Sequence, residues 1–431
     1  MKSSRYNFWS QTPDGSPLLF NGRTGALVEL EATEEQAVRT ALQGQTTQQT
    51  KALFELGFLL SDAEAEDEVA ALLRRRGSRG STSPVLEVTI SPTYGCNFRC
   101  TYCYVDFDDA RMTDDAAERT LLFLEREVPR HPQTNITWFG GEPLLAWRRV
   151  VSMATAFAAI GEREHRPVLQ FLTTNGYLLG GQVARELVGA GVKWFHVTID
   201  GACEAQNTRR VLHRGHPTYD RVLENTVALL EDYPGVGVTL RMNLELDSVP
   251  SVEPLLTTIP KALRARVQVH PTPVIRSGCP TPPELHRAVA SMVTDALSLG
   301  YAYFDNDIPV GRPFHCTAEG EDNFQISPDG RLHKCSPSGK PEVTVGTIDV
   351  RGNRLLNQHA SRWAAAHETA ARCLDCQYLC FCSGGCRLDR VRGTLDDACT
   401  QRFEAVDVHI RNRWLVATLQ SRRGPGATDT G

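Results

Sequence analysis

The chain has 431 residues, of which 41% are hydrophobic and 23% charged, a composition typical of a soluble globular protein with two or three domains. Its formal net charge of −5 gives no reason to expect nucleic acid as a partner. No apolar run approaches the length of a membrane span, and the N-terminus lacks the apolar segment of a signal peptide. We therefore expect a cytoplasmic protein with no membrane and no nucleic-acid partner.

Residues 1–80 are expected to form a small α+β domain. The Asn21-Gly22 dipeptide lies between two apolar runs and predicts a β-hairpin, after which the apolar periodicity becomes that of helices. The run over residues 74–81 is rich in arginine, glycine and serine, a composition typical of a linker. The predicted elements are strands at 18–20 and 26–30 and helices at 33–43 and 46–58.

Strands and helices alternate over residues 85–310, which predicts an α/β domain with a parallel sheet and crossover helices. Six such units are too few for a closed eightfold barrel. We therefore expect an open, partial (β/α)6 TIM-like barrel whose chemistry lies at the C-terminal ends of the strands. The predicted strands are 86–91, 135–139, 168–173, 194–199, 237–244 and 266–274. The predicted helices are 113–129, 146–164, 180–190, 218–233, 251–264 and 283–299.

The periodicity fades after about residue 310, and residues 311–410 hold eight of the 13 cysteines. Disulfide frameworks belong to short secreted chains, and neither condition is met here. Clustered thiolates in a reducing compartment bind metal, so zinc and iron–sulfur clusters are the candidates, and metal sites are expected to organise this region. Residues 420–431 are expected to be a disordered tail.

Three cysteines follow the first predicted barrel strand with the spacing Cys96-x3-Cys100-x2-Cys103. Three thiolates on a cubane cluster leave one iron open to a substrate or cofactor, although the spacing alone also fits a zinc-knuckle fragment. With Tyr102 before its last cysteine, the loop resembles the signature of the radical S-adenosylmethionine (SAM) superfamily. The resemblance implies that the open iron chelates SAM and that electron transfer from the cluster yields a 5′-deoxyadenosyl radical.

The ends of the following strands also resemble SAM-binding motifs of the superfamily. Gly140-Gly141-Glu142-Pro143 ends the second strand, where glycines let backbone carbonyls approach a ligand; alone, the motif also fits a plain strand-end turn. Arg210 is a candidate for the SAM carboxylate, with a solvated surface charge as the alternative. The resemblance implies SAM contacts among Gly140, Gly141, Glu142, Thr174, Thr198, Arg210, Arg241 and Asn243.

The C-terminal cysteines and one glycine resemble the SPASM extension of radical SAM enzymes at every position of its pattern. The pattern reads Cys316-x13-Gly330-x4-Cys335, then Cys373-x2-Cys376-x5-Cys382-x3-Cys386, then Cys399. The resemblance implies two auxiliary clusters, so that three 4Fe–4S clusters are expected. One auxiliary cluster would be held by Cys316, Cys335 and Cys386, and the other by Cys373, Cys376, Cys382 and Cys399.

Some ligand assignments stay open. Cys380 lies outside the pattern and is expected to be a buried thiol, and Cys203 and Cys279 are expected to be inert, although Cys279 follows a barrel strand and could face the cavity. The fourth ligand of the first auxiliary cluster is either absent, which leaves an iron for substrate, or is Glu319, Glu321 or Asp322.

SPASM proteins mostly modify peptides, and two features bear on the type of peptide enzyme. Sulfatase maturases carry an aspartate after the second cysteine of the extension, where this chain has Ser336, which counts against that activity. The N-terminal hairpin and helices loosely resemble the winged-helix element that grips leader peptides by strand addition. A capping domain without a ligand is the alternative interpretation.

We therefore expect a radical SAM oxidoreductase that crosslinks a ribosomally made precursor peptide by net oxidation, with a flavodoxin or ferredoxin as reductant. Two alternatives remain within the superfamily: a dehydrogenase acting on a small molecule or peptide, and an epimerase in which Cys279 donates the hydrogen atom. The alternative from another class is a non-catalytic iron–sulfur electron carrier.

Overall fold

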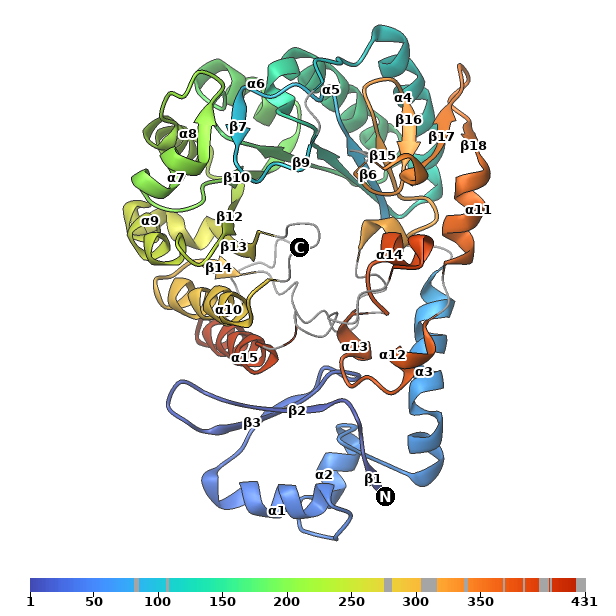
Figure 1. Cartoon of the computed structure of the whole chain (residues 1–431), viewed down its shortest axis with the longest axis vertical. Helices are drawn as coiled ribbons and strands as arrows, with labels where there is room; N and C mark the ends of the chain where they lie inside the picture. Colours follow the sequence, from blue (N-terminus) through green and yellow to red (C-terminus); the bar gives the residue numbers. More distant parts are fainter. Residues whose placement is uncertain are drawn as a thin grey trace.

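A computed structural model describes most of the chain. Figure 1 shows the barrel at one end of the molecule, the N-terminal unit at the other, and the helices α12, α13 and α15 between them. Cys279, Cys399 and residues 424–431 lie outside the described part, so the expectations about them stay predictions. The described residues are 1–80, 85–105, 108–274, 281–303, 316–336, 340–366, 369–382, 384–394, 403 and 405–423.

The predicted six-stranded partial barrel is confirmed. Successive strands of the barrel pair in parallel, each with the next along the chain. Leu86, Val88 and Ile90 are buried in the first strand while the residues between them are half-buried, the period of two that a strand requires. The strands are β6 (Val85–Ile90), β8 (Gln133–Trp138), β9 (Val168–Thr174), β10 (Val192–Thr198), β12 (Gly237–Leu244) and β13 (Val267–Pro273).

Helices cover the outer face of this sheet at the predicted places (Figure 1). The predicted helix at 251–264 is wrong in one respect, because it divides into α9 (Val252–Thr258) and the 3-10 helix η4 (Lys261–Arg266). Ile259 precedes Pro260 and is extended, with ψ at 127°, because a residue before proline disfavours the helical region. The other helices are α4 (Asp114–Glu127), α5 (Trp147–Glu164), α6 (Gly181–Gly189), α7 (Cys203–Arg209), α8 (Tyr219–Asp232) and α10 (Pro283–Ser298).

One helical stretch, Pro143–Glu164, is long and apolar enough to cross a membrane by length and composition. It consists of the short 3-10 helix η2 (Pro143–Ala146) followed by α5. Its apolar side chains Val150, Met153 and Phe157 are buried in the core of the barrel. Core helices of globular proteins can have the same length and apolar composition.

The barrel sheet continues beyond its six predicted strands. At one edge β14 (Ala302–Tyr303) pairs with β13, and at the other β15 (Phe324–Ile326) runs parallel to β6. Three antiparallel strands follow β15, so the described sheet has eleven strands. The C-terminal extension is thus joined to the barrel by backbone pairing. These last strands are β16 (Arg331–His333), β17 (Thr344–Ile348) and β18 (Arg354–Leu356).

The rest of the C-terminal region is helical. Helix α15 packs against both α10 of the barrel and the N-terminal sheet. It continues to Arg423, so the predicted tail beginning at residue 420 is wrong for its first four residues. The helices are α11 (Gln358–Ala365), α12 (Ala371–Leu374), α13 (Leu379–Cys382), α14 (Arg387–Arg392) and α15 (Val406–Arg423).

The N-terminal unit contains the predicted hairpin, extended by one further strand, β2. The predicted linker over 74–81 is wrong as far as Gly80, because α3 continues to that residue; arginine is a good helix former, whatever its frequency in linkers. The predicted helix at 46–58 is shorter. The elements are β1 (Lys2–Ser3), β2 (Asn7–Gln11), β3 (Pro17–Asn21), β4 (Leu27–Glu29), α1 (Ala32–Leu42), α2 (Thr50–Glu55), β5 (Leu59–Leu60) and α3 (Asp62–Gly80).

Candidate functional site

The three-cysteine loop leaves the C-terminal end of β6, as predicted. Its short strand β7 (Phe98–Cys100) pairs antiparallel with β11 (Arg210–Leu212), which places Cys100 opposite Arg210. Burial raises the pKa of Cys96 to about 12, and Glu142, Cys100 and Cys103 add to the shift. The three thiols therefore oppose one another's ionisation, and a positive charge such as that of iron would favour their thiolate forms.

The Gly-Gly-Glu motif joins the end of β8 to the cysteine loop. The Gly141 amide donates to the Thr93 carbonyl at 3.1 Å, and the Glu142 amide donates to the Gly95 carbonyl at 2.8 Å. Gly140 has a φ of 127°, and a Cβ there would lie 2.2 Å from the Thr93 oxygen. The glycines are thus explained by close approach of protein backbone, whereas the sequence suggested approach to a ligand.

The Glu142 carboxylate ties the ends of two strands together from a fully buried position. It accepts hydrogen bonds from the Thr174 hydroxyl at 2.7 Å, the Asn175 amide at 2.7 Å and the Leu144 amide at 3.0 Å. The Asn175 side chain then donates to Asn97 in the cysteine loop at 2.8 Å. Burial raises the pKa of Glu142, while the three donors oppose that shift.

A second network links the cysteine loop to β10, β11 and β12. Arg210 donates to the Tyr102 hydroxyl at 2.6 Å, and the Asn243 side chain donates to the same oxygen at 3.2 Å. The Tyr102 hydroxyl donates to Asp200, which also accepts from the Asn243 amide at 2.8 Å. Arg210 is only 6% exposed, so its interpretation as a surface charge is wrong.

This network puts a buried positive charge beside the Cys100 thiol. Burial alone would lower the pKa of Arg210, but Tyr102, Cys100 and Asp200 raise it, and the net shift is upward. Burial raises the pKa of Cys100, which Arg210 opposes. The guanidinium therefore stays charged and favours the thiolate that a cluster ligand must be. Asp200 lies two residues after β10, in a strand end that resembles one of the superfamily's SAM-binding strand ends.

The remaining predicted SAM contacts, Thr198 and Arg241, lie on the same strand ends. Thr198 ends β10 and is 8% exposed. The Arg241 side chain on β12 donates to the Asn243 side chain at 3.1 Å and lies beside His270. The contacts of these residues with SAM stay predictions.

The first group of C-terminal cysteines is brought together from three segments. Cys335 and Cys386 are among the groups that add to the burial-driven rise in the pKa of Cys316. Cys386 is the N-cap residue of α14, and Cys335 follows β16. Glu319, one of the three candidate fourth ligands, also acts on Cys316.

The candidate fourth ligands differ in what they contact. The Glu319 carboxylate pairs with Arg390 at 2.8 Å, and Asp322 pairs with Arg354. The backbone carbonyl of Glu321 accepts from Lys334 at 2.7 Å. Glu319 is among the charges that raise the pKa of Cys316, so it lies near this cysteine group.

The second group lies on and before α13. Cys373 is buried, while Cys376 and Cys382 are half-buried. The predicted buried thiol, Cys380, is half-buried as a residue, and its thiol interacts electrostatically with Cys382 and Cys376. Within the described residues, no three His, Cys, Asp or Glu side chains converge as a single metal ion requires. The assignment of both cysteine groups to 4Fe–4S clusters therefore stays a prediction from their spacing in the sequence.

Comparison with known proteins defines the class of the barrel. The sequence model of the Radical SAM superfamily matches residues 90–244, which cover the cysteine loop, the Gly-Gly-Glu motif and both polar networks. The chain therefore contains a radical SAM domain. A GTP 3′,8-cyclase of Helicobacter pylori (strain HPAG1) is 27% identical over 189 residues, 42% of this chain and 53% of that protein. The chain thus spans about half the length of this curated relative.

Two solved structures share the fold beyond the barrel. The structure titled "Native anSMEcpe with bound AdoMet and Cp18Cys peptide" matches with a TM-score of 0.61 and 17% identity, over 79% of this chain and 100% of that chain. Streptococcus suis SuiB bound to precursor peptide SuiA matches with a TM-score of 0.55 and 14% identity, over 92% and 99%. The chain therefore resembles radical SAM proteins with a SPASM-type extension in its fold.

Proposed function

We propose that this chain is a radical SAM enzyme that modifies a ribosomally made peptide by net oxidation, with a crosslink as the expected product. The observation that carries the proposal is the cysteine loop held at the strand ends by the Gly-Gly-Glu motif. Two solved proteins of the same fold were captured with peptides, which supports a peptide as substrate. A low-potential donor such as flavodoxin or ferredoxin would supply the electrons.

The groups that such an enzyme needs have matching residues. Cys96, Cys100 and Cys103 would hold the first 4Fe–4S cluster, whose open iron would bind SAM. The bound cofactor supplies a hydrogen-abstracting 5′-deoxyadenosyl radical. Arg210 would favour the thiolate form of Cys100 from its buried position. The two C-terminal cysteine groups would hold the auxiliary clusters, with Cys399 completing the second.

The oxidation can be tested by product mass. One hydrogen atom leaves the peptide to the deoxyadenosyl group, and the second leaves as a proton and an electron that a cluster of suitable potential can accept. Each event should therefore make the peptide about 2 Da lighter, as two hydrogen atoms are lost. The measurement is mass spectrometry of a candidate precursor peptide incubated with enzyme, SAM and dithionite.

Three other outcomes would contradict this proposal in different ways. Unchanged peptide mass with one deuterium gained from heavy water would indicate epimerisation. Conversion of GTP into a cyclised product would indicate the reaction named for the Helicobacter pylori relative. Reduced protein that never produces 5′-deoxyadenosine from SAM would indicate an electron carrier.

The N-terminal unit is proposed to recognise the precursor by strand addition. Its sheet has the order β2-β3-β4, so both β2 and β4 have one unpaired edge within that sheet. Helix α15 packs against β2 and reaches β4 through one hydrogen bond, from the Trp414 side chain to Glu29 at 3.0 Å, and β4 is the edge that we propose for the peptide. We expect precursor binding to slow hydrogen exchange in residues 27–29, measured on the full chain by mass spectrometry. Amides of the barrel strand β10 serve as the control, and equal exchange at residues 27–29 would leave only the capping interpretation.

A further inference from the structure

The N-terminal unit and the second cysteine group share one hydrophobic core. Phe8 of β2 lies 5.0 Å from Phe381 of α13 between ring centroids, and 5.8 Å from Tyr378. Phe20 of β3 stacks on Phe381 at 6.2 Å. The buried Cys373 belongs to the same core. The N-terminal unit therefore covers the segment that carries three of the second auxiliary cluster's four expected ligands.

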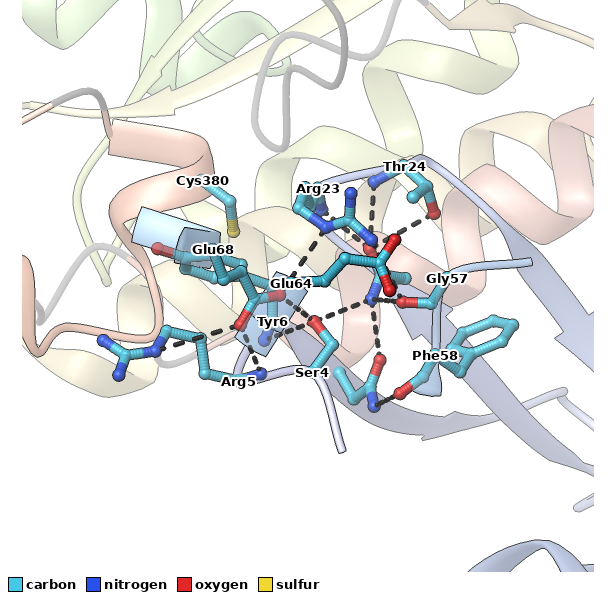
Figure 2. A network of polar contacts seen from close by, with 12 residues as sticks. Ser4, Arg5, Tyr6, Arg23, Thr24, Gly57, Phe58, Glu64, Glu68 and Cys380 are labelled. Carbon is cyan, nitrogen blue, oxygen red and sulfur yellow. Dashed lines mark hydrogen bonds and ion pairs between the residues drawn. The ribbon is translucent and has the colours of Figure 1, made fainter. Parts of the chain in front are cut away.

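The contact is closest at Cys380 and Gly22. A Cβ atom on Gly22 would lie 2.5 Å from the Cys380 sulfur and 2.9 Å from the Phe381 ring. Figure 2 shows the Cys380 side chain directed from α13 toward Tyr6 and Glu68 of the N-terminal unit. Any side chain at Gly22 would separate the two surfaces, so this glycine permits the close packing.

Most polar atoms at this contact are satisfied within the N-terminal unit. The Glu68 carboxylate is 4% exposed and accepts from the Ser4 hydroxyl at 2.5 Å and the Arg5 amide at 3.2 Å. Arg23 completes the group with an ion pair to Glu68 at 3.5 Å. Figure 2 shows this network next to Tyr6.

The Tyr6 hydroxyl is the exception. Tyr6 is 0% exposed, and its hydroxyl has no hydrogen-bond partner among the described residues. A buried hydroxyl without a partner has lost its hydrogen bonds to water and gained none in return, which is unfavourable. Cys380 and Cys376 are among the groups that act electrostatically on Tyr6, so the segment that carries the second cysteine group lies beside its side chain. A phenol is a hydrogen-bond donor, and thiolate and sulfide sulfurs are acceptors.

We propose that Tyr6 is a positioning residue that donates a hydrogen bond to a sulfur of the second auxiliary cluster. The N-terminal unit would then help to set the redox potential of a cluster whose ligands lie more than 360 residues away along the chain. A donor stabilises the more negative reduced cluster, which raises its reduction potential. This inference depends on the proposed function only in requiring that the auxiliary clusters exist.

The test uses the full chain in which Cys96, Cys100 and Cys103 are replaced by alanine, so that only the auxiliary clusters are redox-active. Tyr6→Phe removes the hydroxyl and keeps the ring in the core. We expect unchanged iron content and a more negative midpoint potential for one of two clusters, followed by EPR during redox titration. The matched control is Tyr301→Phe, because Tyr301 is 2% exposed and donates instead to a barrel carbonyl, that of Leu256.

An unchanged potential at full iron content would overturn the proposal. If the Tyr6→Phe protein loses iron, a second variant with 3,5-difluorotyrosine at position 6 is used in its place. This side chain keeps the hydroxyl, and its more acidic phenol donates a stronger hydrogen bond. The potential should then shift in the positive direction, and no shift would again overturn the proposal. A background protein without about eight irons would instead contradict the auxiliary clusters themselves, and with them the proposed function.

Discussion

Replacing Cys96, Cys100 and Cys103 together by alanine is expected to lower the iron content of anaerobically reconstituted protein from about twelve atoms to about eight. Formation of 5′-deoxyadenosine from SAM should be abolished. The reason is that these three thiols lie together on the loop that follows β6, beside the Glu142 and Arg210 networks. Iron analysis and chromatography of SAM cleavage products measure the two effects.

Cys203→Ala is the matched control for this cysteine variant. Cys203 is exposed at the start of α7, and its sulfur accepts from the Asn207 side chain at 3.2 Å. Its replacement should leave iron content and SAM cleavage unchanged. Wild-type protein with about four irons and two zinc ions would contradict the expectation of auxiliary clusters, because zinc would then occupy both C-terminal groups.

The sequence predicted the barrel well because its strands and helices have strong periodicity over six repeats. It failed for β15 to β18, since strands of three to five residues are too short to show a period. One local signal was present: Asp329-Gly330 stands between β15 and β16, and Gly330 has a φ of 79° at that turn. The glycine of the SPASM-like pattern is therefore a turn residue that directs the chain toward Cys335.

The cysteine groups could be predicted because their pattern depends only on the spacing of cysteines along the chain. The network around Tyr102 was not, since its hydroxyl meets Arg210 108 residues away and Asn243 141 residues away. Neither contact has a local pattern, and both depend on which strands become neighbours in the sheet. The same holds for the meeting of Gly22 with Cys380, which joins the two ends of the chain.

Gly141→Ala is expected to have the second large effect. The added Cβ atom would lie 2.3 Å from the Gly95 carbonyl oxygen and 2.4 Å from the Tyr94 carbonyl oxygen. Real Cβ atoms essentially never approach other atoms so closely. Both obstacles are backbone, so the cysteine loop must move away from the end of β8. Overpacking of this kind costs about 1–3 kcal/mol and sometimes more. Gly141 tests close approach better than Gly140, whose φ of 127° would add backbone strain to the clash.

The displaced loop should hold its cluster and SAM poorly while the barrel stays folded. We expect 5′-deoxyadenosine formation to fall at least about tenfold, since about 1.4 kcal/mol in the barrier suffices for that loss. Far-UV circular dichroism should be unchanged. Gly189→Ala is the control, because a Cβ at the end of α6 meets nothing within 4 Å and alanine favours the helix. If Gly141→Ala cleaves SAM as fast as Gly189→Ala, the Gly-Gly-Glu motif does not position the cysteine loop, because the loop would have absorbed the clash without consequence for the chemistry.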